Sequence, residues 1–321
     1  MEILRDPASS SDLPRGGVVT IGNFDGVHRG HQMLVQGAVA RARELGVPAV
    51  ALTFEPHPEK VLRPDSGLRL LATAAQRAQL LARCGLDTLV ELGFDRRLAA
   101  TTAEEFTRQF LHRHLEPREV RLGTNFRFGA RRQGDVALLA ALGAQLGFAV
   151  VGVEPLLDGD EPISSTRVRR EVAHGRVEEA AALLGRVVFV DGKVYSGERM
   201  GRRLGFPTIN VGVDNELIPA HGVYVTGLQI PSFGRVFPSA TNVGVRPTIY
   251  ENYHVTVESH VLDFIADVYR EEVRLFFYRR VRDERVFPSS VELVTQIRKD
   301  VEAARLHFLQ HGMRDGELVL R

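Results

Sequence analysis

The sequence is poor in the residues that build disulfides, metal cages and membrane spans. It has one cysteine, Cys84, and no tryptophan among its 321 residues. One cysteine excludes a disulfide framework and is typical of proteins in a reducing cytosol. No apolar run approaches the roughly 20 residues that cross a bilayer, and the first six residues carry acids where a signal peptide has an apolar segment. We therefore expect a cytoplasmic protein without a membrane partner.

The sequence also has no large excess of positive or negative charge. The 41 Lys and Arg residues are balanced by 40 Asp and Glu residues, which leaves a formal net charge of +1. A chain without a broad positive field is a poor candidate for nucleic-acid binding. The composition, 44% hydrophobic and 25% charged, is that of a globular protein, and the length suffices for two hydrophobic cores. Composition leaves the oligomeric state open.

The most informative stretch covers residues 18–31. An apolar run at 18–21 predicts a buried strand, and the glycines after it predict a turn that enters a helix. The N-terminus of such a helix offers free N–H groups and a positive dipole end to phosphate. His28 and His31 lie three residues apart, on one side of the first turn. The candidate phosphate-binding residues here are Gly22, Asn23, Phe24, Asp25, Gly30, His28 and His31.

Two other interpretations of the histidine pair stay open at this point. The imidazoles could hold zinc, although a structural zinc site needs four ligands and Cys84 is the sole cysteine. They could also be ordinary surface histidines.

The next part of the chain alternates helical and strand patterns. Segment 47–54 predicts a strand that runs into a loop with prolines on both sides of His57, which forbid a helix there. Ligands bind at the carboxyl edge of an open parallel sheet, so His57 is either a ligand contact or an ordinary loop histidine. The other patterns predict helices at 32–45, 74–84, 103–114, 134–146, 168–174 and 177–184 and strands at 88–92, 119–122 and 148–153.

Two later loops carry further candidates. Residues 123–129 hold two phenylalanines between glycines, and these rings could belong to the core or meet a flat ligand ring. Residues 163–169 hold three hydroxyls and two arginines before a helix, a pattern typical of N-capping that also suits phosphate oxygens. The candidates are Asn125, Phe126, Arg127 and Phe128 in the first loop and Ser164, Ser165, Thr166 and Arg167 in the second.

The pattern changes after Gly185 to short β-branched and aromatic runs. These runs, at 187–190, 223–230, 240–243, 254–261 and 272–278, predict an antiparallel sheet closed into a small barrel. An amphipathic segment at 289–310 predicts a long terminal helix. We therefore expect an α/β domain with a Rossmann-like parallel sheet at residues 1–185 and a β-barrel domain with a terminal helix at residues 186–321.

A second glycine-rich stretch opens the barrel domain. Its glycines either serve β-hairpins or form a loop that folds over phosphates. Glu258 lies in a predicted strand, where a surface glutamate is the usual case. Candidate ligand-binding residues in and after this stretch are Gly192, Gly197, Gly201, Arg202, Gly205, Phe206, Pro207 and Arg282.

These motifs resemble those of a known family. Gly-Asn-Phe-Asp-Gly-Val-His-x-Gly-His at 22–31, Thr-Phe-x-Pro-His-Pro at 53–58 and Gly-x-x-x-Gly-Arg-x-Leu-Gly-Phe-Pro-Thr-x-Asn at 197–210 are similar to signatures of bacterial bifunctional riboflavin kinase/FAD synthetases. The resemblance covers nearly the whole chain. One departure is Arg270, at a position where the family commonly has glycine.

The resemblance implies a nucleotidyltransferase in the first domain, which would adenylylate FMN with ATP to give FAD and pyrophosphate. It implies that His28 and His31 act on the ATP phosphates and that residues 163–169 form a second phosphate-binding element. It places His57 and the loop 123–129 at the flavin end of that site.

For the barrel domain the resemblance implies a riboflavin kinase that makes FMN from riboflavin and ATP. Thr208 and Asn210 would organise Mg²⁺ and the phosphates, and Glu258 would be the general base. Asp263 is the second candidate base, although strand alternation would turn it to the opposite face.

Two rival functions remain. One is a nucleotidyltransferase of single activity with a vestigial barrel, which the complete set of kinase residues argues against. The other is a non-catalytic regulator that binds flavin or RNA. Such a protein would not need two sets of phosphate-binding residues, and a net charge near zero is unfavourable for binding RNA.

Overall fold

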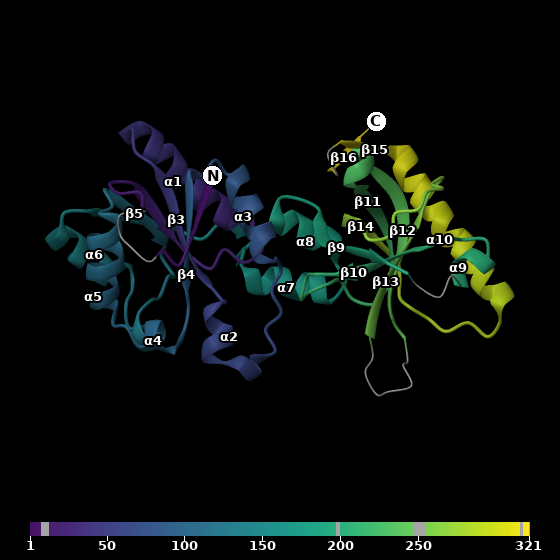
Figure 1. Cartoon of the computed structure of the whole chain (residues 1–321), viewed down its shortest axis with the longest axis horizontal. Coiled ribbons are helices and arrows are strands. Elements are labelled where there is room, and N and C mark those ends of the chain that lie inside the picture. Colours follow the sequence, from purple (N-terminus) through teal and green to yellow (C-terminus); the bar gives the residue numbers. More distant parts are fainter. Residues whose placement is uncertain (8–12, 197–199, 247–253, 315–316, 321) are drawn as a thin grey trace. The chain divides into compact units, whose positions relative to one another are not determined.

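The computed structural model describes residues 1–7, 13–196, 200–246, 254–314 and 317–320. It divides into two compact units, Met1–Ser165 and Thr166–Arg321 (Figure 1). This division differs from the boundary near Gly185, since the segment up to Gly185 groups with the second unit. The physical reason is packing: helix α8 (Val177–Leu184) lies against strands of the barrel.

The first unit is built on a six-stranded parallel sheet, which confirms the predicted α/β fold. The strand order is β1-β4-β3-β2-β5-β6, and all pairs are parallel. All residues of β2 are buried, because helices cover both faces of a parallel sheet. The strands are β1 (Glu2–Arg5), β2 (Val18–Ile21), β3 (Ala49–Glu55), β4 (Thr88–Gly93), β5 (Glu119–Gly123) and β6 (Ala149–Val153).

The helices of this unit begin at polar caps that the sequence carries. Thr102 accepts a hydrogen bond from the Glu105 N–H, and the Glu105 carboxylate accepts one from the Thr102 N–H, which together form a capping box. The main helices are α1 (Arg29–Leu45), α2 (Pro58–Leu62), α3 (Ala74–Arg83), α4 (Arg96–Ala99), α5 (Ala103–Phe106), the π-helical η3 (Thr107–Leu115) and α6 (Val136–Leu146).

The strand order fixes where a ligand can bind. From β2 the chain crosses through α1 to β3 on one side, and it later returns to the other side of β2 with β5. The carboxyl ends of β2 and β5 therefore form the topological switch point, where open α/β sheets bind ligands. The loops 22–28 and 123–129 follow these two strands and share this edge.

The second unit is a closed six-stranded antiparallel barrel, which confirms the predicted small barrel. The order around it is β10-β13-β12-β11-β14-β9. The strands are β9 (Val188–Tyr195), β10 (Ile209–Val213), β11 (Gly222–Ile230), β12 (Arg235–Arg246), β13 (His254–Val261) and β14 (Glu272–Arg282). A short helix α9 (Met200–Arg203) precedes β10, α7 (Ser165–Ala173) begins at the boundary between the units, and β15 (His311–Arg314) pairs with β16 (Glu317–Leu320).

The long helix α10 (Ser290–Gln310) covers one side of the barrel (Figure 1). Ser289 caps it by accepting from the Glu292 N–H. Ala304 and Phe308 of α10 pack with Val225, Ala240 and other apolar residues of the barrel. This packing removes the apolar stripe of α10 from water, which is the main source of stability for a helix in a protein.

One buried histidine makes the barrel unit sensitive to acid. Burial lowers the pKa of His307 to about 4, and the nearby charges of His311 and Arg279 act in the same direction. His307 is only 9% exposed, and its Nε2 has no hydrogen-bond partner among the described residues. The folded state therefore holds the neutral imidazole, and the unfolded chain binds the extra proton at its ordinary pKa.

We expect the stability of this unit to fall as the pH drops from 7 toward 4. From pH 7 to pH 5 the loss attributable to His307 is about 2 kcal/mol. Urea unfolding of the whole chain, followed by circular dichroism at both pH values, measures it, and His307→Leu should flatten the pH dependence. His221→Gln, at an exposed histidine of the same unit, is the matched control. An equal pH dependence in His307→Leu and the wild type would assign the acid sensitivity to other groups.

Candidate functional site

The first site is built at the N-terminus of α1. His28 is the N-cap of this helix, and its Nδ1 accepts a hydrogen bond from the His31 N–H at 3.3 Å. The two imidazoles are stacked with their centroids 3.7 Å apart. Because Nδ1 accepts, the proton of a neutral His28 lies on Nε2, so that nitrogen is the donor of the ring. Both imidazoles therefore lie at the N-terminus of α1, where the helix dipole is positive.

The residues around the pair hold it in position. Phe24 is fully buried and packs its ring edge against His31, with centroids 5.4 Å apart. A Cβ on Gly30 would lie 3.2 Å from the His28 ring, so glycine gives the imidazole its space. The sequence predicted Phe24 as a phosphate-binding residue, but its burial gives it a supporting position beneath the histidines.

Asp25 also takes a supporting position in this structure. Its carboxylate is buried and accepts hydrogen bonds from the backbone N–H groups of Leu71 and Ala72. The Asp25 carbonyl accepts from the Ser165 hydroxyl at 2.9 Å. Gly22 and Asn23 lie at the carboxyl end of β2, where the Asn23 carbonyl accepts from the hydroxyl of Thr53. The loop is thus tied to neighbouring segments, which keeps its backbone in one shape.

The aromatic loop 123–129 lies at the switch point as the strand order requires. Phe128 is buried in the core of the unit, and Phe126 stacks on it with centroids 5.7 Å apart. Asn125 and Arg127 are exposed. Phe128 is therefore a core residue. Asn125, Arg127 and the half-buried Phe126 can contact a ligand.

His57 follows β3 at the same carboxyl edge of the sheet. It is 7% exposed, and its Nδ1 accepts from the Glu59 N–H at the start of α2. Its ring thereby caps a helix, and its Nε2 carries the remaining proton.

The predicted second phosphate element falls across the boundary between the units. Ser164 and Ser165 belong to the first unit, and Thr166 and Arg167 belong to the second. Ser165 begins α7, so the hydroxyl-rich run does open a helix as its composition predicted.

The second site lies on the outer face of the barrel. The hydroxyls of Thr226, Ser239, Thr241 and Ser259 are fully buried and hydrogen-bonded to one another, so these residues face the barrel interior. Because strand residues alternate between faces, Glu258, which precedes Ser259, faces outward.

Strand register aligns the outward polar residues in one row. Asn210 of β10 pairs with Glu258 of β13, and Glu258 pairs in turn with Asn242 of β12. On the other side Asn210 pairs with Tyr195 of β9. Directly opposite residues have their Cβ atoms roughly 4.5–5.5 Å apart, so the amides and the carboxylate form a contiguous patch. Thr208 joins this patch because it precedes Asn210 by two residues.

Two glycines, Gly201 and Gly205, shape the segment before β10. Gly201 lies so close to the Thr208 hydroxyl that a Cβ there would be 3.2 Å from it. Gly205 has φ +85°, a left-handed conformation that glycine adopts without strain. Arg202 lies in α9, and Phe206 and Pro207 lie in the loop after it, where the Pro207 carbonyl contacts the His260 ring nitrogen at 2.8 Å.

The donor set of this patch fits magnesium. Thr208, Asn210 and Glu258 offer a hydroxyl, an amide and a carboxylate oxygen, which are the hard donors that Mg²⁺ takes alongside phosphate oxygens. In the part of the chain that the structure describes, no group of three or more His, Cys, Asp and Glu residues is arranged to hold a metal by itself. The patch therefore suits an ion that arrives with a nucleotide.

Gly192 and Gly197 are the other two glycines predicted for the phosphate-binding loop. Gly192 lies inside β9 and not in a loop, which corrects the prediction from glycine spacing; a Cβ there would collide with the carbonyl of Gly212 on β10. Its role is to let two strands of the barrel approach. Gly197 lies outside the described residues.

The structure gives Arg282 and Asp263 partners on α10. Arg282 Nη2 donates to Asp300 at 2.7 Å, and Asp263 accepts from Arg305 at 2.6 Å. The ion pair with Arg305 holds the pKa of Asp263 below its usual range. Asp263 lies beyond the end of β13, so it does not join the polar row.

The structure adds two residues to the kinase candidates. Asn242 joins the row through strand register, and Glu284 lies beside it, since a Cβ on Gly244 would meet both side chains. Sequence reasoning missed them because the register of β12 against β13 cannot be read from spacing. The one available signal was Glu284 in the run 281–287, which follows the last barrel strand.

The fold and the two sites define a class of protein. A parallel sheet with a histidine pair on a helix N-terminus at its switch point handles nucleotide phosphates. A separate barrel with hydroxyl, amide and carboxylate groups in one patch suits magnesium–nucleotide chemistry. The chain is a two-domain enzyme of nucleotide-dependent group transfer.

Comparison with known proteins identifies the particular family. A family model described as FAD synthetase matches residues 10–167, and one described as riboflavin kinase matches residues 184–308. The bifunctional riboflavin kinase/FMN adenylyltransferase of Escherichia coli strain K12 is 36% identical over 310 residues, which cover 96% of this chain and 98% of that one. The protein of the same name from Pseudomonas fluorescens is 38% identical over 306 residues, or 95% and 97% of the two chains.

A solved structure is similar to this chain over nearly its whole length. It is described as a macrolide-efflux protein from Streptococcus pneumoniae, and it matches with a TM-score of 0.87 and 30% identity over 95% of this chain and 99% of that one. Within the described ranges, no helix is both long and apolar enough to span a membrane.

The chain belongs to the bifunctional riboflavin kinase/FMN adenylyltransferase family. It is a flavin-forming enzyme that uses ATP in both reactions, and its adenylyltransferase segment precedes its kinase segment. The interpretation of the motifs as those of this family is thereby confirmed.

Proposed function

We propose that the two reactions take place at two separate sites: riboflavin phosphorylation at the polar row of the barrel and FMN adenylylation at the histidine pair of the parallel sheet. The observation that carries the proposal is the presence of one phosphate-handling set in each compact unit. The activity boundary near Gly185 remains our prediction. We also propose a cytoplasmic location, in keeping with the single cysteine.

In the kinase step, Glu258 accepts the proton of the primary ribityl hydroxyl of riboflavin. The hydroxyl oxygen attacks the γ-phosphorus of ATP, a new phosphorus–oxygen bond forms, and ADP leaves with the former bridging oxygen. Thr208 and Asn210 would hold Mg²⁺, which when bound neutralises phosphate charge. Asn242 and Glu284 lie beside Glu258, where they can orient it.

In the adenylyl step, an ionised phosphate oxygen of FMN attacks the α-phosphorus of ATP and pyrophosphate leaves. No base is required, because the FMN phosphate is already deprotonated at neutral pH. His28, His31 and the N-terminus of α1 stabilise the charge that develops on the departing pyrophosphate. Asn125, Arg127, His57 and Phe126 surround the flavin end, and Ser164 and Ser165 contribute to the phosphates.

Incubation with riboflavin, ATP and Mg²⁺, followed by chromatography of the flavins, tests the function. We expect FMN first and FAD later, and FAD alone when FMN is supplied. FAD formation from FMN without any FMN formation from riboflavin would favour the single-activity rival. Flavin binding without turnover would favour the regulator.

If Thr208 binds Mg²⁺, its replacement should lower the kinase activity and leave the adenylyltransferase activity unchanged. Replacing Thr208 with alanine removes one oxygen donor, and loss of groups around a metal site typically costs roughly 10–100-fold in metal affinity or activity. We expect FMN formation to fall by that factor at low Mg²⁺, with partial recovery at high Mg²⁺. Adenylylation of supplied FMN by the same variant is the internal control. Normal FMN formation at all Mg²⁺ concentrations would remove Thr208 from the site.

A further inference from the structure

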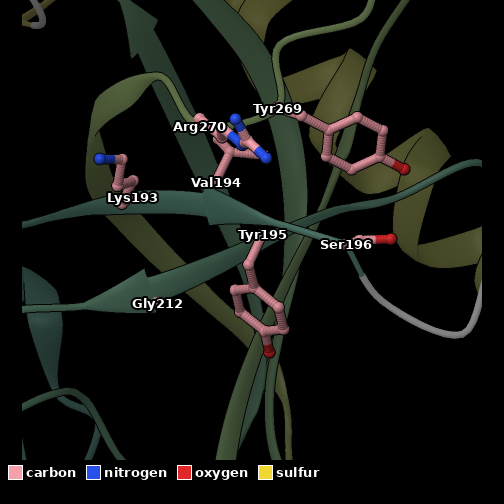
Figure 2. Close-up of a pocket in the computed structure, with 7 residues that line it drawn as sticks. All are labelled: Lys193, Val194, Tyr195, Ser196, Gly212, Tyr269 and Arg270. Atoms are coloured by element: carbon pink, nitrogen blue, oxygen red, sulfur yellow. The ribbon is translucent and has the colours of Figure 1, made fainter.

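The groove beside the polar row belongs to the proposed kinase site. It measures about 650 Å³, and Lys193, Tyr195, Tyr269 and Arg270 are among the residues that line it (Figure 2). Tyr195 pairs with Asn210, so the groove and the polar row share one face of the barrel. A group of charged side chains that neither proposed reaction uses lies in the first unit.

This group is a chain of four charged residues near the carboxyl edge of the parallel sheet. Arg5 of β1 donates to Glu91 of β4 at 3.0 Å, and Arg77 of α3 donates to the other oxygen of Glu91 at 2.9 Å. The same nitrogen of Arg77, Nη2, also donates to Glu55 of β3 at 2.9 Å. Positive and negative groups therefore alternate from β1 to the carboxyl end of β3.

The side chain of Arg77 is held in place independently of Glu55. It is 5% exposed, and Glu91, which is 4% exposed, compensates its charge. Most surface ion pairs are weak because two long side chains must be immobilised to form them. Here the arginine is already immobile, so only the Glu55 side chain, which is 44% exposed, loses freedom. The contact between Arg77 and Glu55 is therefore stronger than an ordinary surface pair.

Helix α3, which carries Arg77, is also tied to the loop of the histidine pair. The helix begins at a capping box formed at Thr73. Just before this cap, Leu71 and Ala72 donate their backbone N–H groups to the buried carboxylate of Asp25. The start of α3 thereby supports the loop on the ATP side of the proposed adenylylation site.

Glu55 connects the same helix to the flavin side. It is the last residue of β3, and two residues later His57 lies between Pro56 and Pro58. Proline restricts its own φ and the conformation of the residue before it, so the backbone of segment 55–58 has little freedom. An ion pair that immobilises Glu55 therefore also limits the movement of His57.

We infer that Arg77 is a positioning residue for FMN: through Glu55 it holds segment 55–58 in the place that receives the flavin. Arg77 is buried and acts through Glu55 without touching the substrate. The inference rests on the proposed adenylylation site. It assigns to α3 the alignment of the flavin side of that site with the ATP side.

Glu55→Ala removes this contact and leaves the buried pair of Arg77 with Glu91 intact. We expect the KM for FMN in FAD formation to rise about two- to tenfold, the range that one hydrogen bond represents in an equilibrium constant, with the KM for ATP unchanged. Glu55→Gln keeps an oxygen that accepts from Arg77 and should restore most of the affinity. Glu44→Ala, which breaks an exposed pair with Arg41 at the far end of α1, is the matched control.

Arg77→Lys separates positioning from a direct contact of Glu55 with the flavin. Lysine keeps the positive charge beside Glu91, since an unpaired buried carboxylate would destabilise the unit. Lysine is shorter than arginine and cannot bridge both glutamates. We therefore expect it to raise the KM for FMN as Glu55→Ala does, and the double variant should be no worse than either single variant.

Three results would overturn the inference. An unchanged KM for FMN in Arg77→Lys, or additive effects in the double variant, would assign Glu55 to direct contact with the flavin. Equal rises in the KM for FMN and for ATP would show that α3 supports the unit as a whole. Normal FAD formation by His31→Ala would instead refute the proposed adenylylation site.

Discussion

Replacing Glu258 with glutamine is expected to lower the rate of FMN formation by roughly 10²–10⁴, the usual contribution of a general base. Glutamine keeps the shape of the side chain and its hydrogen-bonding oxygen but cannot accept the ribityl proton. Register with Asn210 and Asn242 holds the side chain on the outer face of the barrel, so the substitution leaves the strand pairing unchanged. Riboflavin binding should therefore survive while kcat falls.

Two comparisons make this result specific. Asp263→Asn removes the other carboxylate that the sequence offered as a base, and its ion pair with Arg305 is a surface pair. Such pairs contribute only about 0–1 kcal/mol, so we expect a folded, active kinase. FMN production, riboflavin binding and FMN adenylylation should be measured side by side. Near-normal FMN production by Glu258→Gln would remove this residue from the mechanism.

Replacing His31 with alanine is expected to lower the rate of FAD formation by roughly 10²–10³, the typical loss on removing one donor to a developing charge. His31 stacks on His28 at the helix N-terminus, so its loss weakens the stabilisation of the departing pyrophosphate. FMN formation should be unaffected, because it takes place in the other unit. Both activities are read from one chromatogram of flavins formed from riboflavin and ATP.

His28 needs a different substitution, because it also caps α1. Alanine would remove the cap and cost about 1 kcal/mol of stability. His28→Asn keeps an oxygen that can accept from the His31 N–H and still removes the imidazole donor. We expect FAD formation to fall as in His31→Ala with little change in the unfolding midpoint. Equal loss of FMN and FAD formation would indicate misfolding, and zinc in the purified protein would revive the metal interpretation.

Some features of the site followed from local sequence. The strand–turn–helix at residues 18–45 could be predicted because an apolar run, glycines and a helical periodicity follow one another within one short segment. The caps Thr102 and Ser289 are equally local, since a cap acts on residues three positions away. Local rules of this kind also predicted the barrel strands from their β-branched runs.

Other features were misjudged because they depend on distant residues. Gly192 was taken for a loop residue, yet β10, which follows after a long connection, presses against it. The side chains of Phe24 and Asp25, predicted as phosphate-binding residues, lie inward because of contacts with His31 and with the N–H groups of Leu71 and Ala72. The first compact unit ends before Gly185 because α8 packs on strands of the barrel, whereas the predicted activity boundary at Gly185 stays a prediction.

The sequence by itself determined the two-part plan, the parallel sheet followed by a barrel, the histidine pair at a helix start and the family. These depend on periodicity, turns, caps and contiguous motifs, which act within a few residues. Only the tertiary structure decided that Asn210, Glu258 and Asn242 stand in one row, that Glu284 lies beside them, and that Lys193 and Arg270 line one groove. Strand register and barrel closure bring these residues together, and both are set by the packing of segments far apart in the chain.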